Sequence, residues 1–279
     1  MHVSWRKRVS RLLRGRLRSL ALSNHGIGVL ADTKNGLLVV DPRDFGVSGS
    51  LLSQGAYDWP AIAWLLPLLN AESRLVFVGA HLGALLVPLA IQSGARQIVA
   101  FEPSPHNYRL LKMNLALNGL TATVVHNQAV GNSEGSVRFV QNPINTGNSR
   151  ISSVGEVVVP VTTLDIALRP EGQVTDLLVL DTEGFEAYAM RGGPQTLART
   201  RYLYVEFSPE QLIEQGSTTG EFIELVASRF ESMYLQGEKA EFFPSRTYVK
   251  YLTELPLRRG LLLNLLFSNE TQPTPQLVS

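Results

Sequence analysis

The apolar run Leu178-Val179-Leu180 stops at a cluster of acidic side chains. Asp181, Glu183 and Glu186 follow one another within six residues. Because burying a charged side chain is costly, such a cluster belongs at the end of a strand, where it faces water or a ligand. The pattern therefore predicts a buried strand with a ligand site at its carboxyl end.

Two apolar runs further upstream end in a similar way. Residues 74–78 lead directly into a turn, 79–83, that begins and ends with glycine, and residues 97–101 end on Glu102. Glycines after a strand let the backbone turn sharply and let a ligand approach it closely. Glu102 follows Gly83 by 19 residues, about the interval at which doubly wound folds place an acid that binds ribose hydroxyls. The series predicts a site for a nucleoside-containing cofactor.

Strand and helix patterns alternate along most of the chain. The apolar runs and turn residues predict strands at 36–40, 74–78, 97–101, 122–127, 175–180 and 201–207. Helices are expected at 83–93, 104–118, 184–190 and 218–229, with another beginning after Asp58. Alternation of this kind is typical of an α/β fold with a doubly wound, mostly parallel sheet and helices on both faces.

Four segments, taken in order, carry a family pattern. They are 39–44 with 55–57; the 79–83 turn; 101–105 with Leu110, Asn114, Leu117 and Asn118; and Asp181-x-Glu183-Gly184-x-Glu186 with Gly192 and Gly193. Their order and spacing resemble the FkbM family of S-adenosylmethionine-dependent methyltransferases, from about Val39 to about Ser268. The resemblance implies a Rossmann-like fold of the class I methyltransferase type. It also implies S-adenosylmethionine as cofactor and methylation of a hydroxyl on a glycan or secondary metabolite.

One departure from the family concerns the first turn, which the family writes Asp-x-Gly-Ala-Asn-x-Gly. Here Phe77 stands at the Asp position and His81 at the Asn position. The family carboxylate is expected to hold the ammonium group of the cofactor, and a charge-assisted hydrogen bond of that kind contributes about 1.5 to 3 kcal/mol. We therefore expect weakened cofactor binding unless another acid substitutes.

The resemblance assigns site residues one by one. Expected cofactor contacts are Gly79, Ala80, His81, Gly83, Glu102, Pro103, Gln128, Ala129 and Asp181. An alcohol is a poor nucleophile at neutral pH, so a base or a metal must assist loss of its proton, and Asp181 and Glu183 are the catalytic candidates. His81 is a further candidate, as a contact to the cofactor's carboxylate or as a base.

Asp181 admits several roles. It could accept the cofactor's ammonium, contact the acceptor hydroxyl, or ligate a divalent ion together with Glu183. In the alternative, both acids cap the helix expected near Gly184, where acids favour the positive end of the dipole; the dipole accounts equally well for Glu186. No dedicated metal site is predicted, because the histidine spacing fits none.

The stretch 131–174 is too long for an ordinary connection, which takes fewer than about 12 residues. It is expected to hold two strands, 135–140 and 156–161, around a polar loop, 142–150. We interpret the loop as a lid over the acceptor site, with a surface hairpin as the alternative, because loops rich in Asn, Gly and Ser are common.

Two other classes of function stay open. The loss of the acid at Phe77 is the motive for a catalytically silent relative that binds a nucleoside or a partner through the same fold. An NAD(P)-dependent oxidoreductase is the weaker alternative, because the turn lacks the third glycine of dinucleotide binders and no Tyr-Lys pair is evident. Nothing in the pattern predicts nucleic-acid binding.

The start of the chain is strongly basic. It carries seven cationic side chains before the first acidic residue, Asp32: Arg6, Lys7, Arg8, Arg11, Arg14, Arg16 and Arg18. Apolar residues at helical spacing over 5–20 predict an amphipathic helix that packs on the domain or contacts anionic membrane surfaces. An organelle transit peptide is a further interpretation.

Composition sets the outer limits. A chain of 279 residues with 44% hydrophobic content can bury a full core, and we expect one methyltransferase domain, 31–268, between a basic extension, 1–30, and a disordered tail, 269–279. The absence of cysteine excludes disulfides and thiolate nucleophiles and fits a reducing, cytoplasmic location. The longest apolar runs are shorter than the ~20 residues that span a bilayer.

Overall fold

A central sheet dominates the computed structural model, which describes residues 26–142, 145–169, 173–237, 239–256, 258–272 and 274. Within these residues the sheet has eight strands in the order β13-β12-β14-β11-β10-β3-β4-β5. Their bounds are β3 Arg74–Val78, β4 Gln97–Phe101, β5 Val124–His126, β10 Thr175–Leu180, β11 Thr200–Phe207, β12 Ser232–Leu235, β13 Glu241–Pro244 and β14 Leu263–Ser268. The strands from β11 to β5 run parallel, whereas β14 pairs antiparallel with both β11 and β12.

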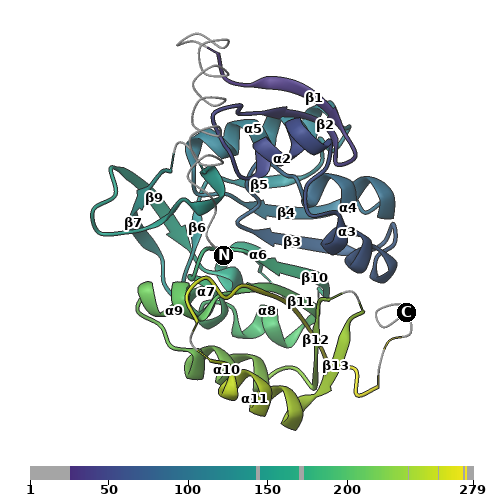
Figure 1. Cartoon of the computed structure of the whole chain (residues 1–279), viewed down its shortest axis with the longest axis vertical. Coiled ribbons are helices and arrows are strands. Elements are labelled where there is room, and N and C mark those ends of the chain that lie inside the picture. The colour runs from purple at the N-terminus through teal and green to yellow at the C-terminus, as the bar shows by residue number, and fades with distance from the viewer. Residues whose placement is uncertain are drawn as a thin grey trace.

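Helices cover both faces of this sheet (Figure 1). One layer contains α2 Val47–Gln54, α3 Trp59–Leu65, the 3₁₀ turn Leu66–Leu68, α4 Leu86–Ser93 and α5 Pro105–Leu117. The other contains α6 Leu164–Leu168, α7 Glu186–Arg191, α8 Pro194–Ala198, α9 Pro209–Glu214, α10 Thr219–Ala227 and α11 Ser245–Glu254. Successive strand side chains point to opposite faces, so Leu75 and Phe77 pack into the first layer and Val76 and Val78 into the second. The predicted α/β fold is confirmed.

Two smaller sheets flank the central one. The hairpin β1 Val29–Thr33 and β2 Gly36–Val40 lies beyond α5 (Figure 1). The second has the order β6-β9-β7-β8 and comprises β6 Ala129–Val130, β7 Gly135–Val140, β8 Arg150–Ile151 and β9 Val157–Thr162. It contains both strands that were expected in the long stretch before β10, and the 3₁₀ turn Thr146–Asn148 lies in the polar loop between β7 and β8.

Most predicted elements are present, and two helices begin later than predicted. The strands predicted at 36–40, 74–78, 97–101, 135–140 and 175–180 have those bounds. The helix expected from residue 83 begins at Leu86, because Gly83 has a left-handed φ of 92°. The helix expected from residue 184 begins at Glu186, since Gly184 has φ 96°. A left-handed residue cannot belong to a right-handed helix.

The ends of the chain are described only in part. The basic segment expected to form an amphipathic helix lies outside the described residues. Of the tail expected to be disordered, residues 269–272 and 274 are described, and Glu270 accepts a hydrogen bond of 2.7 Å from the Tyr202 hydroxyl. No helix among the described residues has the length and apolar character to cross a membrane.

Candidate active site

A cavity of about 580 Å³ opens at the carboxyl ends of β3, β4, β10 and β11. Its position is the one at which ligands bind in open α/β sheets. Every residue expected to bind the cofactor lines it, with the exception of Gly83: Gly79, Ala80, His81, Glu102, Pro103, Gln128, Ala129 and Asp181. The catalytic candidate Glu183 lines it as well. The sequence pattern and the cavity therefore identify the same site.

The turn after β3 is built around Gly79. Its φ is 84°, and a Cβ atom placed there would lie 1.7 Å from the carbonyl oxygen of Asp181. The backbone N–H groups of Gly79 and Ala80 both donate to the Phe101 carbonyl oxygen, at 2.9 and 3.0 Å. Gly83 instead faces the helices, since a Cβ atom there would lie 2.9 Å from Leu111. Glycine is favoured at position 83 because a Cβ atom would clash with Leu111 and because φ is left-handed in the turn.

His81 occupies the position where the family has asparagine. Its φ of 51° is left-handed, a conformation that Asn and His adopt more readily than most residues. Its backbone N–H donates to Glu102 Oε2 at 2.8 Å, and its Nε2 lies 2.7 Å from the Thr146 hydroxyl. Burial lowers the pKa of the imidazole to about 4, so the ring is neutral at pH 7.

Glu102 directly follows β4, beneath this turn, and is 4% exposed. Its second oxygen, Oε1, accepts a hydrogen bond of 2.9 Å from the Ser104 N–H. Ser104 also caps α5 through the Asn107 N–H. Burial raises the pKa of Glu102 to about 7, although the hydrogen bonds act in the opposite direction. Two turns thus hold one carboxyl group at the wall of the cavity.

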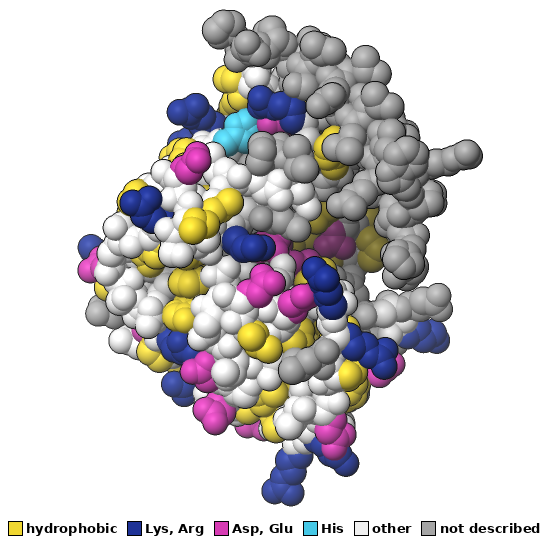
Figure 2. All heavy atoms as spheres, turned by 60° about the vertical axis from the view of Figure 1, so that its left-hand side comes forward, with side chains coloured by type: hydrophobic (Ala, Val, Ile, Leu, Met, Phe, Trp, Pro, Cys, Tyr) yellow, Lys and Arg dark blue, Asp and Glu magenta, His cyan; other side chains and the backbone are white. Residues whose placement is uncertain are grey.

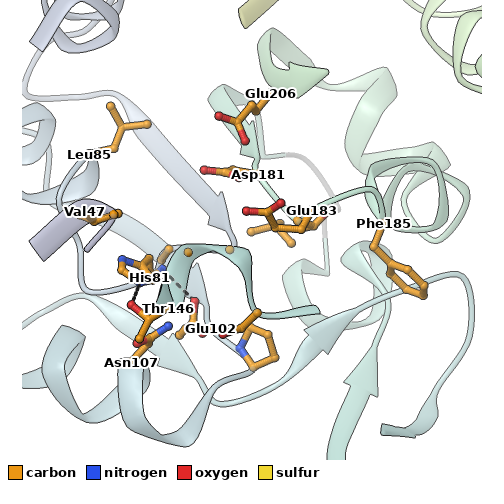
Figure 3. Close-up of a pocket in the computed structure, with 18 of the residues that line it drawn as sticks. Val47, His81, Leu85, Glu102, Asn107, Thr146, Asp181, Glu183, Phe185 and Glu206 are labelled. Carbon is orange, nitrogen blue, oxygen red and sulfur yellow. Dashed lines mark hydrogen bonds between the residues drawn. The ribbon is translucent and has the colours of Figure 1, made fainter. Parts of the chain in front are cut away.

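Three more carboxyl groups meet on the opposite wall (Figure 3). Oxygen atoms of Asp181, Glu183 and Glu206 all lie within 4.8 Å of one another. Burial, followed by repulsion from neighbouring acids, raises the pKa of Asp181 well above its usual range and that of Glu183 to about 8. The same causes raise the pKa of Glu206 to about 7. A divalent ion could fit such a spacing, but acids cluster in proteins without metals, and we assign no metal here.

Glu206 is a site residue that the sequence interpretation missed. It lies near the end of β11, a strand that was predicted over 201–207, and lines the cavity. The signal was the one that identified Asp181, an acid at the carboxyl end of an otherwise apolar strand. Only the pairing of β10 with β11 shows that the two acids are neighbours.

Glu186 has a structural role. It is 2% exposed, and its Oε1 accepts hydrogen bonds from the Thr182 N–H, the Thr182 hydroxyl and the Gly184 N–H, at 2.9, 2.8 and 3.1 Å. Its carboxyl group therefore holds the turn that presents Glu183, to which Gln211 also donates a hydrogen bond.

The polar loop after β7 reaches the cavity. Asn145, Thr146 and Gly147 are among the lining residues, whereas residues 143 and 144 lie outside the described part. The Thr146 N–H donates to Asp44 at 3.1 Å, and the Thr146 hydroxyl contacts His81. The described part of the loop therefore lies against the 79–83 turn.

Phe77, which replaces the family acid, is 1% exposed and belongs to the hydrophobic core. It pairs with Val179 across β3 and β10, and Asp181, two residues after Val179, points to the same face of the sheet. Carboxyl groups therefore enter this region from β10 and β11 rather than from β3.

Comparison with known families agrees with the site. The model of the methyltransferase FkbM domain matches residues 78–234, more than half of the chain. The chain belongs to the FkbM methyltransferase family. No curated protein matches it.

Solved structures that are similar to this one include several methyltransferases. TYW2 of M. jannaschii in complex with AdoMet has a TM-score of 0.42 at 13% identity over 86% of this chain and 84% of that one. An rRNA methylase from Streptococcus thermophilus gives 0.42 at 10% identity over 75% and 95%. The bifunctional kinase-methyltransferase WbdD has a TM-score of 0.38 at 14% identity. The match covers 70% of this chain and 34% of WbdD.

Proposed function

We propose that the protein transfers a methyl group from S-adenosylmethionine to a hydroxyl group of a glycan or secondary metabolite. The observation that carries the proposal is the cavity, in which a cofactor turn and Glu102 form one wall and a cluster of carboxyl groups forms the other. The family assignment supplies the type of reaction. The sulfonium of the bound cofactor would supply the reactive methyl group.

The residues of the chain divide between the two reactants. Glu102 is suited to accept hydrogen bonds from the ribose, and Gln128 and Ala129 line the cavity beyond it. Asp181 and Glu183 are the candidates to accept the proton of the acceptor hydroxyl, because a raised pKa makes the ionised form of each carboxyl group a stronger base. Enclosure by the walls aligns the reactants and excludes water.

The charge of the cavity favours an uncharged or cationic acceptor. Among the described residues, those that line it include several acids but neither lysine nor arginine. Figure 2 shows acidic side chains grouped near the centre of one face of the molecule, with Lys and Arg side chains next to them. Carboxylates accept hydrogen bonds from sugar hydroxyls, whereas a phosphate or carboxylate on the acceptor would be repelled.

A catalytically silent, nucleoside-binding protein is the second candidate, and Phe77 is the observation that favours it. Titration calorimetry with S-adenosylmethionine and its demethylated product, against NAD and NADP, separates the candidates. Binding of the methyl donor, followed by labelled methyl transfer to a component of a glycan or metabolite extract, supports the enzyme. Binding without transfer supports the silent protein, and binding of NAD or NADP alone contradicts both.

Replacing Glu102 with alanine should weaken S-adenosylmethionine binding by about 1 to 3 kcal/mol, because ribose hydroxyls would lose their acceptor. Calorimetry measures the change, and thermal unfolding shows whether the variant is folded, since Glu102 also accepts hydrogen bonds from His81 and Ser104. Unchanged affinity in a folded variant would remove Glu102 from the cofactor site.

The basic segment 5–20 is proposed to bind anionic membranes reversibly, because each cationic side chain near such a surface contributes about 1 kcal/mol. Sedimentation with anionic vesicles should retain the full chain at low salt and release it at high salt. A variant without residues 1–20 serves as the control. Equal recovery of both proteins in the supernatant would contradict membrane binding and would favour the alternative that the segment packs on the domain.

A further inference from the structure

The pairing of β10 with β11 places two carboxyl groups next to each other. The strands are parallel, and Leu180 lies opposite Val205, so the next residues along, Asp181 and Glu206, are also neighbours and point to one face. Figure 3 shows both side chains directed to the same side of their strands, toward the cavity. The fold itself therefore fixes their separation.

Oxygen atoms of the two carboxyl groups lie within 4.8 Å of each other, and each group perturbs the pKa of the other. Two ionised carboxylates this close in a buried site repel strongly, so retention of one proton is favoured. We propose that Asp181 and Glu206 share a single proton and act as one unit with one negative charge, in which Glu206 is the positioning residue for Asp181.

The surroundings of this carboxyl pair favour the shared proton. Groups that act on it are Tyr57 and Asp58 before α3, Glu183 and Glu186 after β10, and Tyr204 within β11. Within the described part of the chain, none of these groups is a cation that could compensate a second negative charge, and the cation Arg150 acts on the neighbouring Glu183 instead. Among the described residues, no backbone N–H donates to either carboxyl group, in contrast to Glu102 and Glu186.

The carboxyl pair gives a balanced route for the proton of the acceptor. This step rests on the proposed methyl transfer. As the acceptor oxygen forms its bond to the methyl carbon, the bond from that carbon to sulfur breaks, and the sulfonium becomes a neutral thioether. The hydroxyl proton moves to the carboxyl pair, which becomes fully protonated and neutral. The positive charge of the sulfonium and the negative charge of the pair are thereby lost together.

Infrared difference spectroscopy of the free protein tests the pair without cofactor. At pH 7 the wild type should show the C=O band of the protonated pair beside bands of Glu183 and Glu102, whose pKa values are also raised. Asp181→Asn and Glu206→Gln should each alter the band of the pair. The surface substitution Glu224→Gln on α10 should not. A wild-type protein without such a band would overturn the proposal, and this measurement needs no folded variant.

The pH dependence of methyl transfer provides a second test. Loss of the shared proton at high pH leaves two adjacent charges, so the wild-type rate should fall on the alkaline side. Glu206→Gln keeps an N–H donor at every pH, so it should abolish the alkaline limb and retain measurable activity. Glu206→Leu has no donor and should be at least tenfold slower than Glu206→Gln. An unchanged alkaline limb in Glu206→Gln would contradict the pair.

The metal content of the purified protein provides a third test. A stoichiometric divalent ion in the purified wild type that Glu206→Gln loses would make these acids metal ligands and overturn the shared proton. A protonated pair in a protein that methylates nothing would refute the proposed function and leave the pair intact.

Discussion

Asp181→Asn is expected to lose at least about a hundredfold in the rate of methyl transfer, the low end of what a positioned general base contributes. The substitution preserves the size of the side chain and removes its charge. Asp181 stands at the wall of the cavity, directly after β10, with its carboxyl group beside Glu183 and Glu206. The effect should fall on the rate more than on the affinity for S-adenosylmethionine.

Asp32→Asn is a matched control, because Asp32 is exposed on β1. Circular dichroism establishes that both variants are folded. A chelator distinguishes two explanations of the loss, since a base needs no divalent ion and a metal-assisted hydroxyl does. If Asp181→Asn turned over any acceptor at nearly the wild-type rate, Asp181 would have no catalytic role.

The sequence predicted most of one wall of the cavity, the wall that we propose binds the cofactor. Residues 79–83 and Glu102 each follow an apolar run. A strand that is buried on both faces is apolar along its length, so the first glycine or polar residue after the run marks its end. The structure confirms that these ends meet at one cavity. Local pattern was sufficient here because each residue acts at the end of its own strand.

The opposite wall could not be predicted in the same way. That Glu206 contacts Asp181 depends on the pairing of two strands about 25 residues apart in sequence, which no local pattern specifies. The strand β14 is a similar case, because an apolar run at 260–267 does not reveal that it inserts antiparallel between β11 and β12. Both features are set by tertiary packing.

Phe77→Asp is expected to destabilise the protein strongly, and to leave cofactor binding no tighter in any fraction that folds. Phe77 is 1% exposed in the hydrophobic core, and removal of a buried phenylalanine side chain costs about 3 to 5 kcal/mol. The new carboxylate would also lie on the face that already carries Asp181 and Glu206, so it would be buried beside like charges.

Restoring the family residue is therefore not expected to restore the family's site. The sequence predicts weakened cofactor binding unless another acid takes the place of the family carboxylate. In the structure, β10 and β11 already direct carboxyl groups into this region. Phe77→Leu is the matched control, since it removes ring packing without adding charge and should cost less than Phe77→Asp. Thermal unfolding ranks the two variants, and calorimetry measures S-adenosylmethionine binding. Tighter binding by a folded Phe77→Asp protein would show that the contact was lost and that neither Asp181 nor Glu206 has replaced it.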